Sequence, residues 1–496
     1  MRLFSSSINT TSSGVDVPSS IKRFRYGKDY SISSNTDTFG VNASEMEYLS
    51  WKYGIRSTVY EGMNSNPVIR DQYKQNIFEC SIYWLANKYS DPTDLATPDY
   101  TSSNYSASGE SAFNVTNGDP KLQRYPNNGT QLYYITDGRL GVKLNRPLNS
   151  WDMGQEGTTI SDSFDPTNIT DNTLFIESYG TEGDGFGATF NKNINTSPQR
   201  HKCISYNFGQ EGTWQQKAEY FLSARNSESG DNASGNYFDD WDILERYQIS
   251  QPSSTRITDT MVGTDADKVA WIKDKIQTVT IPTNGWYNNF THWHSADMSL
   301  MDDFYLGLKE TNTGDNCWFS GMSEASEYRW FLNMITNVSA SFTGISCLVS
   351  VTIDNVYNIP TNHIITPVSV EIDLSGTSLS GKNITSNKGG ILSLGADKYI
   401  VEVNATDLFV LISEGVEDYY DDINPSVLSS VLNGSDLTIT TDQNTVVTLF
   451  SDELGTVVDR TYDNQKIHVI NNITPSTYYV GVMNNMNRTI IETITL

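Results

Sequence analysis

The chain has 496 residues, more than one hydrophobic core usually supports, so we expect several domains. Acidic side chains outnumber basic ones by 59 to 33, and the formal net charge is −26 at pH 7. Each contact to a nucleic-acid phosphate needs Lys or Arg, so this balance argues against a nucleic-acid partner. No apolar stretch approaches the roughly 20 residues that span a bilayer, which argues against membrane insertion.

Residues 1–29 are rich in Ser and Thr and carry one basic cluster between Lys22 and Lys28. This composition predicts an arm or adaptor segment that docks to a partner. The segment lacks the apolar middle region of a secretory signal, so either a signal was removed or the chain is not exported by that route, and we favour the second interpretation. The four cysteines lie far apart without a CxxC pair, which favours reduced thiols.

Strand and helix patterns alternate over residues 30–343. A polar strand from Tyr30 is followed by a helix with Asn42 as its cap and Gly54 as its stop, and then by an apolar strand over 55–60. This order forms a βαβ unit and implies a parallel pair of strands. The region therefore predicts an α/β fold, either a distorted (β/α) barrel or an open layer.

The later elements of this region continue the alternation. We expect strands over 202–208, 279–281 and 317–320, and helices over 213–224, 264–276, 299–308 and 323–335. Thr264 with Asp267 and Ser299 with Asp302 have capping-box spacing. Residues from about 90 to 190 are crowded with Asn, Gly, Ser, Asp and Pro. They predict a long loop insertion that either binds a ligand or another subunit, or is poorly specified.

The apolar period changes to two near the end of this region. Alternating strands predict a β-sandwich over 344–423 and a second one over 424–496. The stretch Pro475–Met483 is similar to the penultimate strand of fibronectin type III-like modules. The predicted fold class is thus a multidomain chain with an α/β part followed by all-β sandwich modules.

Two of the five histidines lie in an aromatic segment that runs from Trp286 to His294. In a strand, His292 and His294 would point to one face, the spacing that brings two imidazoles to one metal ion or one substrate. Asp297 lies just beyond and is a third metal-ligand candidate. The aromatic candidates for binding a sugar are Trp286, Tyr287 and Trp293. Ordinary packing of these polar and aromatic side chains is the alternative interpretation.

Parts of the chain resemble polysaccharide deacetylases. That family ends with a His-bearing strand, a helix, and a Trp-Phe strand followed by a Glu-containing helix, and this chain is similar over 285–294, 301–304, 317–320 and 323–328. Two other segments of this chain resemble the family's first unit. They are Thr36–Gly40, where an acid follows a strand, and the strand Gly54–Val59. Arg124 begins a segment similar to the family's Arg-x-Pro-x-Gly groove motif, with one extra residue.

The resemblance implies a barrel with a glycan substrate, in which Asp37, His292 and His294 are the catalytic candidates. A divalent metal such as zinc would polarise an acetamide carbonyl while a carboxylate activates water. The family's metal triad is not intact here, because Asp37 stands alone where paired acids are usual and no histidine precedes His201. Arg124 and Glu211, the latter at a predicted strand end, are further substrate-binding candidates. Enzymatic activity is left undecided by the sequence.

Three hypotheses about function follow. The first is a virion tail protein, such as a phage tail protein, or a surface-associated protein that binds or trims bacterial surface polysaccharide for host-cell attachment. Its partners would be the glycan, other virion or surface proteins, and further copies of itself in a homo-oligomer. The second is a free extracellular metal-dependent polysaccharide deacetylase. The third is a non-catalytic structural virion protein with a degenerate barrel. A composition rich in Asn, Ser, Thr and Tyr with only 19% charged residues suits sugar recognition, although codon bias explains it equally.

Overall fold

The computed structural model describes residues 14–36, 43–61, 77–83, 263–291, 297–355, 361, 364–388, 390–416 and 422–496, together with short strands between 121 and 256. The chain divides into two compact units. The smaller unit comprises Met1–Lys28 and Tyr328–Asp422, and the larger unit comprises Asp29–Glu327 and Ile423–Leu496. No helix in these described ranges is long and apolar enough to cross a membrane.

Parallel strands form the framework of the larger unit. Successive parallel pairings join β3 (Tyr30–Thr36), β4 (Ser57–Glu61), β5 (Phe78–Tyr83), β10 (Cys203–Ser205), β11 (Ser223–Glu228), β13 (Ser253–Arg256) and β14 (Trp286–Phe290). β14 also pairs in parallel with β3, so the run of pairings returns to the strand at which it began. Two further strands join this sheet: β15 (Cys317–Phe319) lies parallel to β3, and β12 (Phe238–Asp239) lies antiparallel to β14.

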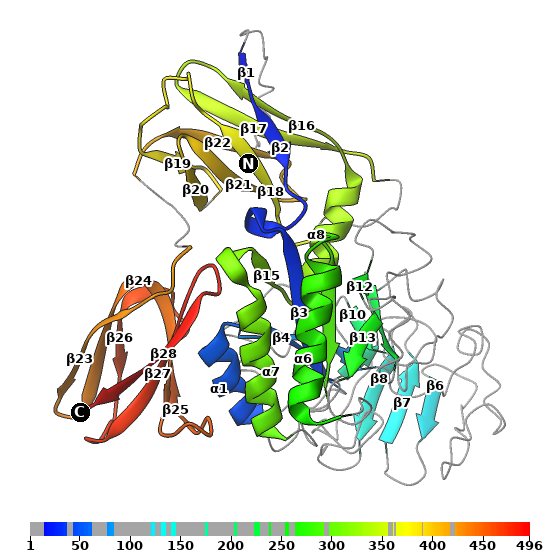
Figure 1. Cartoon of the computed structure of the whole chain (residues 1–496), viewed down its shortest axis with the longest axis vertical. Coiled ribbons are helices and arrows are strands. Elements are labelled where there is room, and N and C mark those ends of the chain that lie inside the picture. Colours follow the sequence, from blue (N-terminus) through cyan, green and yellow to red (C-terminus); the bar gives the residue numbers. More distant parts are fainter. Residues whose placement is uncertain are drawn as a thin grey trace. The chain divides into compact units, whose positions relative to one another are not determined.

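Helices cover one face of β3 and β14. They are α1 (Ala43–Tyr53), α6 (Asp265–Lys275) and α7 (Met298–Thr311), and α7 contacts both of the others (Figure 1). A fourth helix, α8 (Met322–Met334), follows β15. The apolar core between strands and helices includes Ile32, Trp51, Tyr287, Met301, Phe304, Tyr305 and Leu308.

Local signals set the helix ends largely as predicted. Thr264 and Asp267 form the capping box of α6. Gly54 ends α1 with a φ of +69°, a left-handed conformation that glycine adopts without a steric penalty. The predicted cap of α7 is wrong by two residues, because the Asp297 carboxylate accepts a hydrogen bond from the Ser299 backbone N–H. An aspartate also favours this position because its charge complements the helix dipole.

The predicted strand over 279–281 is wrong. Helix α6 continues directly into the π-helical turn η3 (Ile276–Thr280). Ile272, Ile276 and Val279 all pack into the core, and their spacing follows one face of a helix. A short run of β-branched residues does not distinguish a strand from the end of a buried helix.

The region of about 90–190 contains more than loops. Four antiparallel strands form a separate sheet in the order β6 (Lys121–Arg124), β7 (Thr130–Tyr134), β8 (Leu140–Leu144) and β9 (Leu174–Ile176). The prediction of a long loop insertion is therefore incomplete. Most of the predicted helix over 213–224 lies outside the described residues. The prediction is wrong for Ser223 and Ala224, which begin the strand β11.

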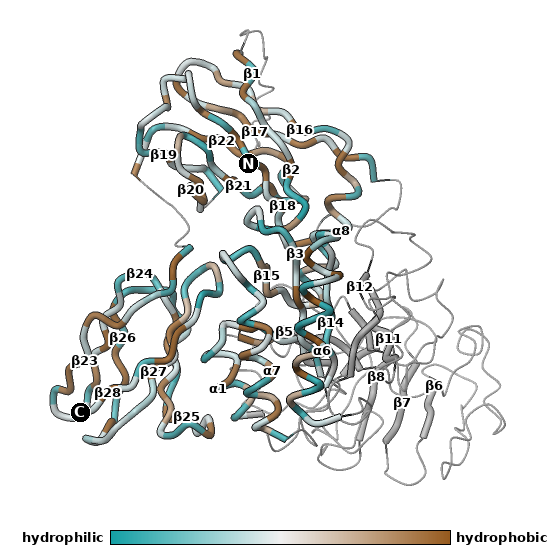
Figure 2. The backbone as a smooth tube through the Cα atoms, in the orientation of Figure 1, coloured by the Kyte–Doolittle hydropathy of each residue, from teal (hydrophilic) through white to brown (hydrophobic). Residues whose placement is uncertain are grey.

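The C-terminal part of the larger unit is all-β, as predicted. Its strands are β23 (Val427–Asn433), β24 (Asp436–Phe450), β25 (Val457–Arg460), β26 (Gln465–Ile470), β27 (Thr477–Asn484) and β28 (Thr489–Thr495). β24 is one long strand of 15 residues, and buried residues alternate with more exposed ones along it from Asp436 to Val447. The C-terminal strands carry both hydrophilic and hydrophobic residues (Figure 2). β23, β25, β26 and β27 all pair with β24, and β28 pairs with β27.

The smaller unit holds two antiparallel sheets. One has the order β1 (Val15–Val17), β16 (Ile335–Phe342), β17 (Ser346–Ile353), β22 (Phe409–Glu414) and β19 (Ile384–Ser386). The other has the order β2 (Ser19–Ile21), β18 (Val368–Asp373), β21 (Lys398–Val403) and β20 (Ile391–Gly395). The predicted arm over 1–29 is wrong for residues 15–21, because these residues pair with β16 and β18.

The boundary predicted after residue 343 also needs correction. β16 already belongs to the smaller unit, whose second chain segment begins within α8 at Tyr328. In β16 only Ala340 and Phe342 are buried, and most of the other positions are Ser, Thr or Asn. The strand therefore shows no clear alternation of apolar and polar residues in the sequence. The basic cluster of the N-terminal segment likewise has internal partners, since Arg25 pairs with Glu402 at 2.6 Å and Lys28 with Asp422 at 3.2 Å.

Helix α1 packs against the C-terminal strands within the larger unit. Tyr48 meets the ring of Phe450 edge to face, with the ring centroids 5.5 Å apart. Gly481 lies against Trp51 so closely that a Cβ atom there would come within 2.9 Å of the indole ring. Glu47 accepts two hydrogen bonds from the Arg460 guanidinium, and its side chain is fully buried. A buried carboxylate of this kind depends on its partner for compensation.

Replacing Arg460 with Ala should lower the free energy of unfolding of the larger unit by about 3–5 kcal/mol, because the buried Glu47 carboxylate then loses the opposite charge and the two hydrogen bonds of the guanidinium. Lys52→Ala is the matched control: Lys52 lies on the same helix and pairs with Asp302 at 2.8 Å, but these two side chains are 40% and 39% exposed. Such a surface pair contributes about 1 kcal/mol or less. Urea unfolding of both variants measures the difference, and equal losses would contradict the structural role of the Arg460–Glu47 pair.

His468 on β26 should make the stability of the larger unit depend on pH. Its buried ring lies 3.1 Å from the Thr445 hydroxyl and 3.0 Å from the Thr461 hydroxyl, and burial lowers the pKa of the imidazole. The unfolded chain therefore binds a proton near pH 6.5 that the folded chain does not, so stability should fall as the pH drops below about 6.5. Urea unfolding of His468→Gln should show a smaller loss between neutral and mildly acidic pH. An unchanged pH dependence would refute this role.

Candidate functional site

The candidate site is built on the face of β3 and β14 that points away from the helices. Ile32 and Tyr287 are register partners and pack into the helical core. Because side chains alternate along a strand, their neighbours point to the opposite face. These neighbours, joined by a serine that follows β15, are Ser31, Ser33, Asn35, Trp286, Asn288 and Ser320, and we call this set the polar face. All six side chains are fully buried.

Hydroxyl groups at the amino-terminal half of the polar face satisfy one another. Ser320 Oγ lies 2.8 Å from Ser31 Oγ and 3.0 Å from Ser33 Oγ. Ser31 also donates to the Trp318 carbonyl at 2.9 Å, and the Trp286 indole N–H donates to Ser33 Oγ at 2.9 Å. Buried polar groups are tolerated when they are hydrogen-bonded in this way. This half of the face therefore connects β3, β14 and the segment after β15.

At the carboxyl-terminal half of the polar face, the amide side chains do not satisfy all of their hydrogen-bonding groups within the described residues. Asn35 Nδ2 donates to Asn288 Oδ1 and to the Asn289 carbonyl, both at 2.5 Å. The two remaining polar atoms of this amide pair, the acceptor Asn35 Oδ1 and the donor Asn288 Nδ2, are buried without a hydrogen-bond partner in the part of the chain that the structure describes. An unsatisfied buried polar group is costly, so its presence indicates a site for water or a ligand.

The ends of β3 and β14 lie side by side at the same edge of the sheet. Asn35 and Phe290 are register partners, and the Thr291 N–H donates to the Asn35 carbonyl at 2.9 Å. Asp37 is the next residue after the end of β3, and His292 is the next after Thr291. Both of these catalytic candidates lie outside the described residues, as do Trp293 and His294.

The predicted sugar-binding role of Trp286 and Tyr287 needs correction. Both rings are fully buried: Tyr287 lies in the helical core, and Trp286 is held by Ser33 on the polar face. Neither ring offers a face to a sugar at the surface. The aromatic pattern alone does not distinguish a binding platform from a packed strand, because large aromatic side chains serve both purposes.

The other predicted site residues divide into those that are described and those that are not. Asp297 caps α7, and hydrogen bonds from Ser299 hold the pKa of its carboxyl below the usual range. Arg124 lies on β6, of which only the backbone is described, and Glu211 lies outside the described residues. Within the described ranges, no group of three or more His, Cys, Asp or Glu side chains is placed to hold a metal ion. Cys317 and Cys347 are buried free thiols.

Sequence reasoning missed a buried ion pair beside the start of β4. Arg56 donates to Glu324 of α8 at 2.9 Å, and both side chains are almost fully buried. The Met322 N–H donates to Thr58 Oγ1 at 2.8 Å, so the start of α8 is tied to β4. The partners lie 268 residues apart in the chain, and no local pattern signals their contact. In the β3–β4 register Ser57 pairs with Ser34 and Thr58 pairs with Asn35, so the Arg56–Glu324 pair lies beside the carboxyl-terminal half of β3, near the end of that strand.

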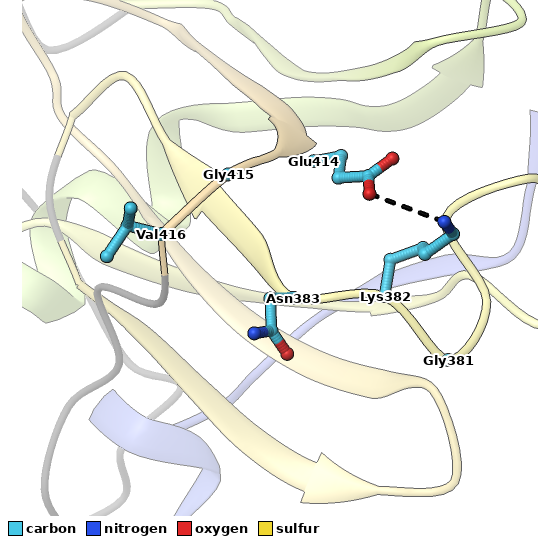
Figure 3. A pocket seen from close by; sticks show the side chains of 6 residues that line it. All are labelled: Gly381, Lys382, Asn383, Glu414, Gly415 and Val416. Atoms are coloured by element: carbon cyan, nitrogen blue, oxygen red, sulfur yellow. Dashed lines mark hydrogen bonds and ion pairs between the residues drawn. The ribbon is translucent and has the colours of Figure 1, made fainter.

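A second candidate region is an open hollow in the smaller unit. It is lined by Gly381, Lys382, Asn383, Glu414, Gly415 and Val416 (Figure 3). Lys382 and Glu414 point toward each other across it, with 3.3 Å between Lys382 Nζ and Glu414 Oε1. Both side chains are well exposed, so the pair can open to a ligand at little cost. The hollow contains no buried unsatisfied polar atom within the described residues, unlike the polar face.

No protein-family model matches this chain, and no curated protein matches it in sequence.

Trp286→Phe should lower the free energy of unfolding of the larger unit by about 1–3 kcal/mol, because Ser33 loses its buried indole donor while the ring volume is largely kept. Asn35→Ala should cost a similar amount, since it leaves Asn288 Oδ1 and the Asn289 carbonyl without their donor. Chemical unfolding of both variants measures these losses. Wild-type stability in both would show that the polar face is not buried as described.

Proposed function

We propose that the chain is a glycan-directed protein of a virion tail or cell surface, which binds bacterial surface polysaccharide at the edge where β3 and β14 end. The observation that carries the proposal is the Asn35–Asn288 amide pair at that edge, with one buried acceptor and one buried donor left over. Sugar hydroxyls and N-acetyl groups each combine a donor with an acceptor, so they complement such a pair.

The run of parallel pairings supports a distorted (β/α) barrel for the larger unit. Seven strands pair in parallel from β3 through β14 and back to β3, while helices pack on one face. In such a barrel the polar face would line the interior. Barrels of this kind carry their sites at the carboxyl-terminal ends of their strands, the edge proposed here.

Asp37 and His292 follow the register partners Asn35 and Phe290 by two residues each in the sequence, and both lie outside the described residues. Deacetylation is the second function proposed, in which a carboxylate and an imidazole act on a bound acetamide group. The resemblance to polysaccharide deacetylases in the sequence supports it.

The metal that the deacetylase resemblance implies finds no ligand set in the described residues. Asp297, one of its predicted ligands, is engaged at the start of α7. Glycan binding is the primary proposal because the Asn35–Asn288 pair carries it, and acetyl removal is tested beside it. The all-β smaller unit and the C-terminal strands, proposed as sandwich modules, would attach the chain to other virion or surface proteins. A purely structural virion protein is the outcome if no glycan binds.

The test uses the full chain with N-acetylated bacterial polysaccharide. Co-sedimentation measures binding, acetate release measures turnover, and elemental analysis of the purified protein measures bound metal. Asp37→Ala and His292→Ala should abolish acetate release and weaken binding by about tenfold, a loss of about 1.4 kcal/mol. Lys382→Ala, in the open hollow, is the control that should leave both readings unchanged.

Binding without acetate release or metal would leave a glycan-binding protein. Loss of binding in Lys382→Ala alone would move the site to the hollow of the smaller unit. Absence of binding to any N-acetylated polysaccharide would overturn the proposal and favour the structural alternative.

A further inference from the structure

Three of the C-terminal strands of the larger unit, β23, β25 and β26, each pair with β24 alone in the described part of the chain, so each has an open edge. β25 carries Asp459 and Arg460 and β26 carries Lys466, whereas β23 carries no charged side chain. β28, at one end of the order β23-β24-β27-β28, packs against α1. β23, at the other end, pairs with β24 and with no other strand in the described part of the chain. The outer backbone groups of an edge strand are a ready template for pairing with another strand.

β23 lacks the features that usually protect such an edge. Its sequence, Val-Leu-Ser-Ser-Val-Leu-Asn, contains neither a charged residue nor a proline. Leu428 and Val431 are 65% and 56% exposed. One bulge lies at its start, between Val427 and Ser429, and the register from Ser429 to Asn433 is regular. Natural edge strands are normally blunted by charges, prolines or bulges along their length, so this regular, uncharged segment is unusual.

The apolar surface continues from β23 across the sheet. Val431 pairs with Thr438 of β24, and Thr438 pairs with Val469 of β26, so the two valines lie in one row on the outer face. Ile467 and Val469 are 56% and 53% exposed. The exposed row beside the open edge would add side-chain contacts to any strand that pairs there.

Charge indicates which partner fits this edge. The chain carries a net charge of −26, so two copies repel each other over most of their surface. Residues 424–435, which include β23, contain no charged side chain. A contact between identical acidic chains is least opposed where neither copy presents charge, so a second copy of this chain is favoured over a basic partner, which would seek the acidic surface.

We infer that β23 is a self-association edge, through which two copies pair antiparallel about a twofold axis at Val431. In this register Val431 faces Val431, Ser430 faces Leu432, and Ser429 faces Asn433 of the other copy. Each pair joins residues that point to the same side of the sheet, as an antiparallel ladder requires. An isologous contact of this kind closes as a dimer and leaves no further open edge at β23.

Sedimentation velocity of the full chain over a range of micromolar concentrations tests the inference. The wild type should form a dimer, and added salt should strengthen it because salt screens the repulsion between acidic copies. Val431→Lys places two like charges face to face on the axis and should raise the dimer Kd by about tenfold or more. Val458→Lys is the matched control: this exposed valine lies on β25, and its variant should dimerise like the wild type.

Circular dichroism of each variant shows whether it is folded. If Val431→Lys is unfolded, Leu428→Lys serves as the second variant, because Leu428 is the more exposed residue of the strand. A wild type that stays monomeric at high salt would overturn the inference. So would dimerisation that survives in the folded lysine variant of β23, or that is lost equally in Val458→Lys.

Discussion

The parallel pairing of β3 with β14 is the constraint on which the candidate site depends. It aligns two strands on which one set of side chains, including Ile32 and Tyr287, packs with the helices to form the core. The same register brings Ser33 opposite Asn288 on the other face. A strand with both faces buried must satisfy its polar side chains internally, and the serines of β3 do so through Ser320 and Trp286. Within the described part of the polar face, the Asn35–Asn288 amide pair at the strand ends leaves one acceptor and one donor over, which is why the site is assigned there.

The larger unit also shows why its C-terminal strands are more than an appendage. α1 buries Trp51 and Glu47 against them, and Arg460 compensates the buried carboxylate. α1 in turn packs against α7, which carries Phe304 and Tyr305 into the core beneath β3. Tyr305 lies within hydrogen-bond distance of Ser34 on β3 and Ser57 on β4. The C-terminal strands thus support the same strands that end at the candidate site.

The sequence predicts those features that depend on local chemistry. Gly54 and the Thr264 capping box specify helix ends by themselves, and both are confirmed. The strand β3 and its parallel neighbour β4 are likewise confirmed. The arm predicted over 1–29 is partly wrong, because short strands there gain their stability from β16 and β18, which lie more than three hundred residues away. The Arg460–Glu47 pair joins equally distant residues. The burial of Trp286 also depends on a residue far away in the chain, Ser33, and no local sequence pattern predicts it.

A crystal structure of the full chain with an N-acetylated oligosaccharide tests the central claim most directly. The account predicts a sugar whose amide or hydroxyl groups lie within hydrogen-bond distance of Asn35 Oδ1 or Asn288 Nδ2, with the Asp37 and His292 side chains at the same strand ends. Ordered water satisfying both amides, with the sugar bound in the hollow beside Lys382 or nowhere, would contradict it.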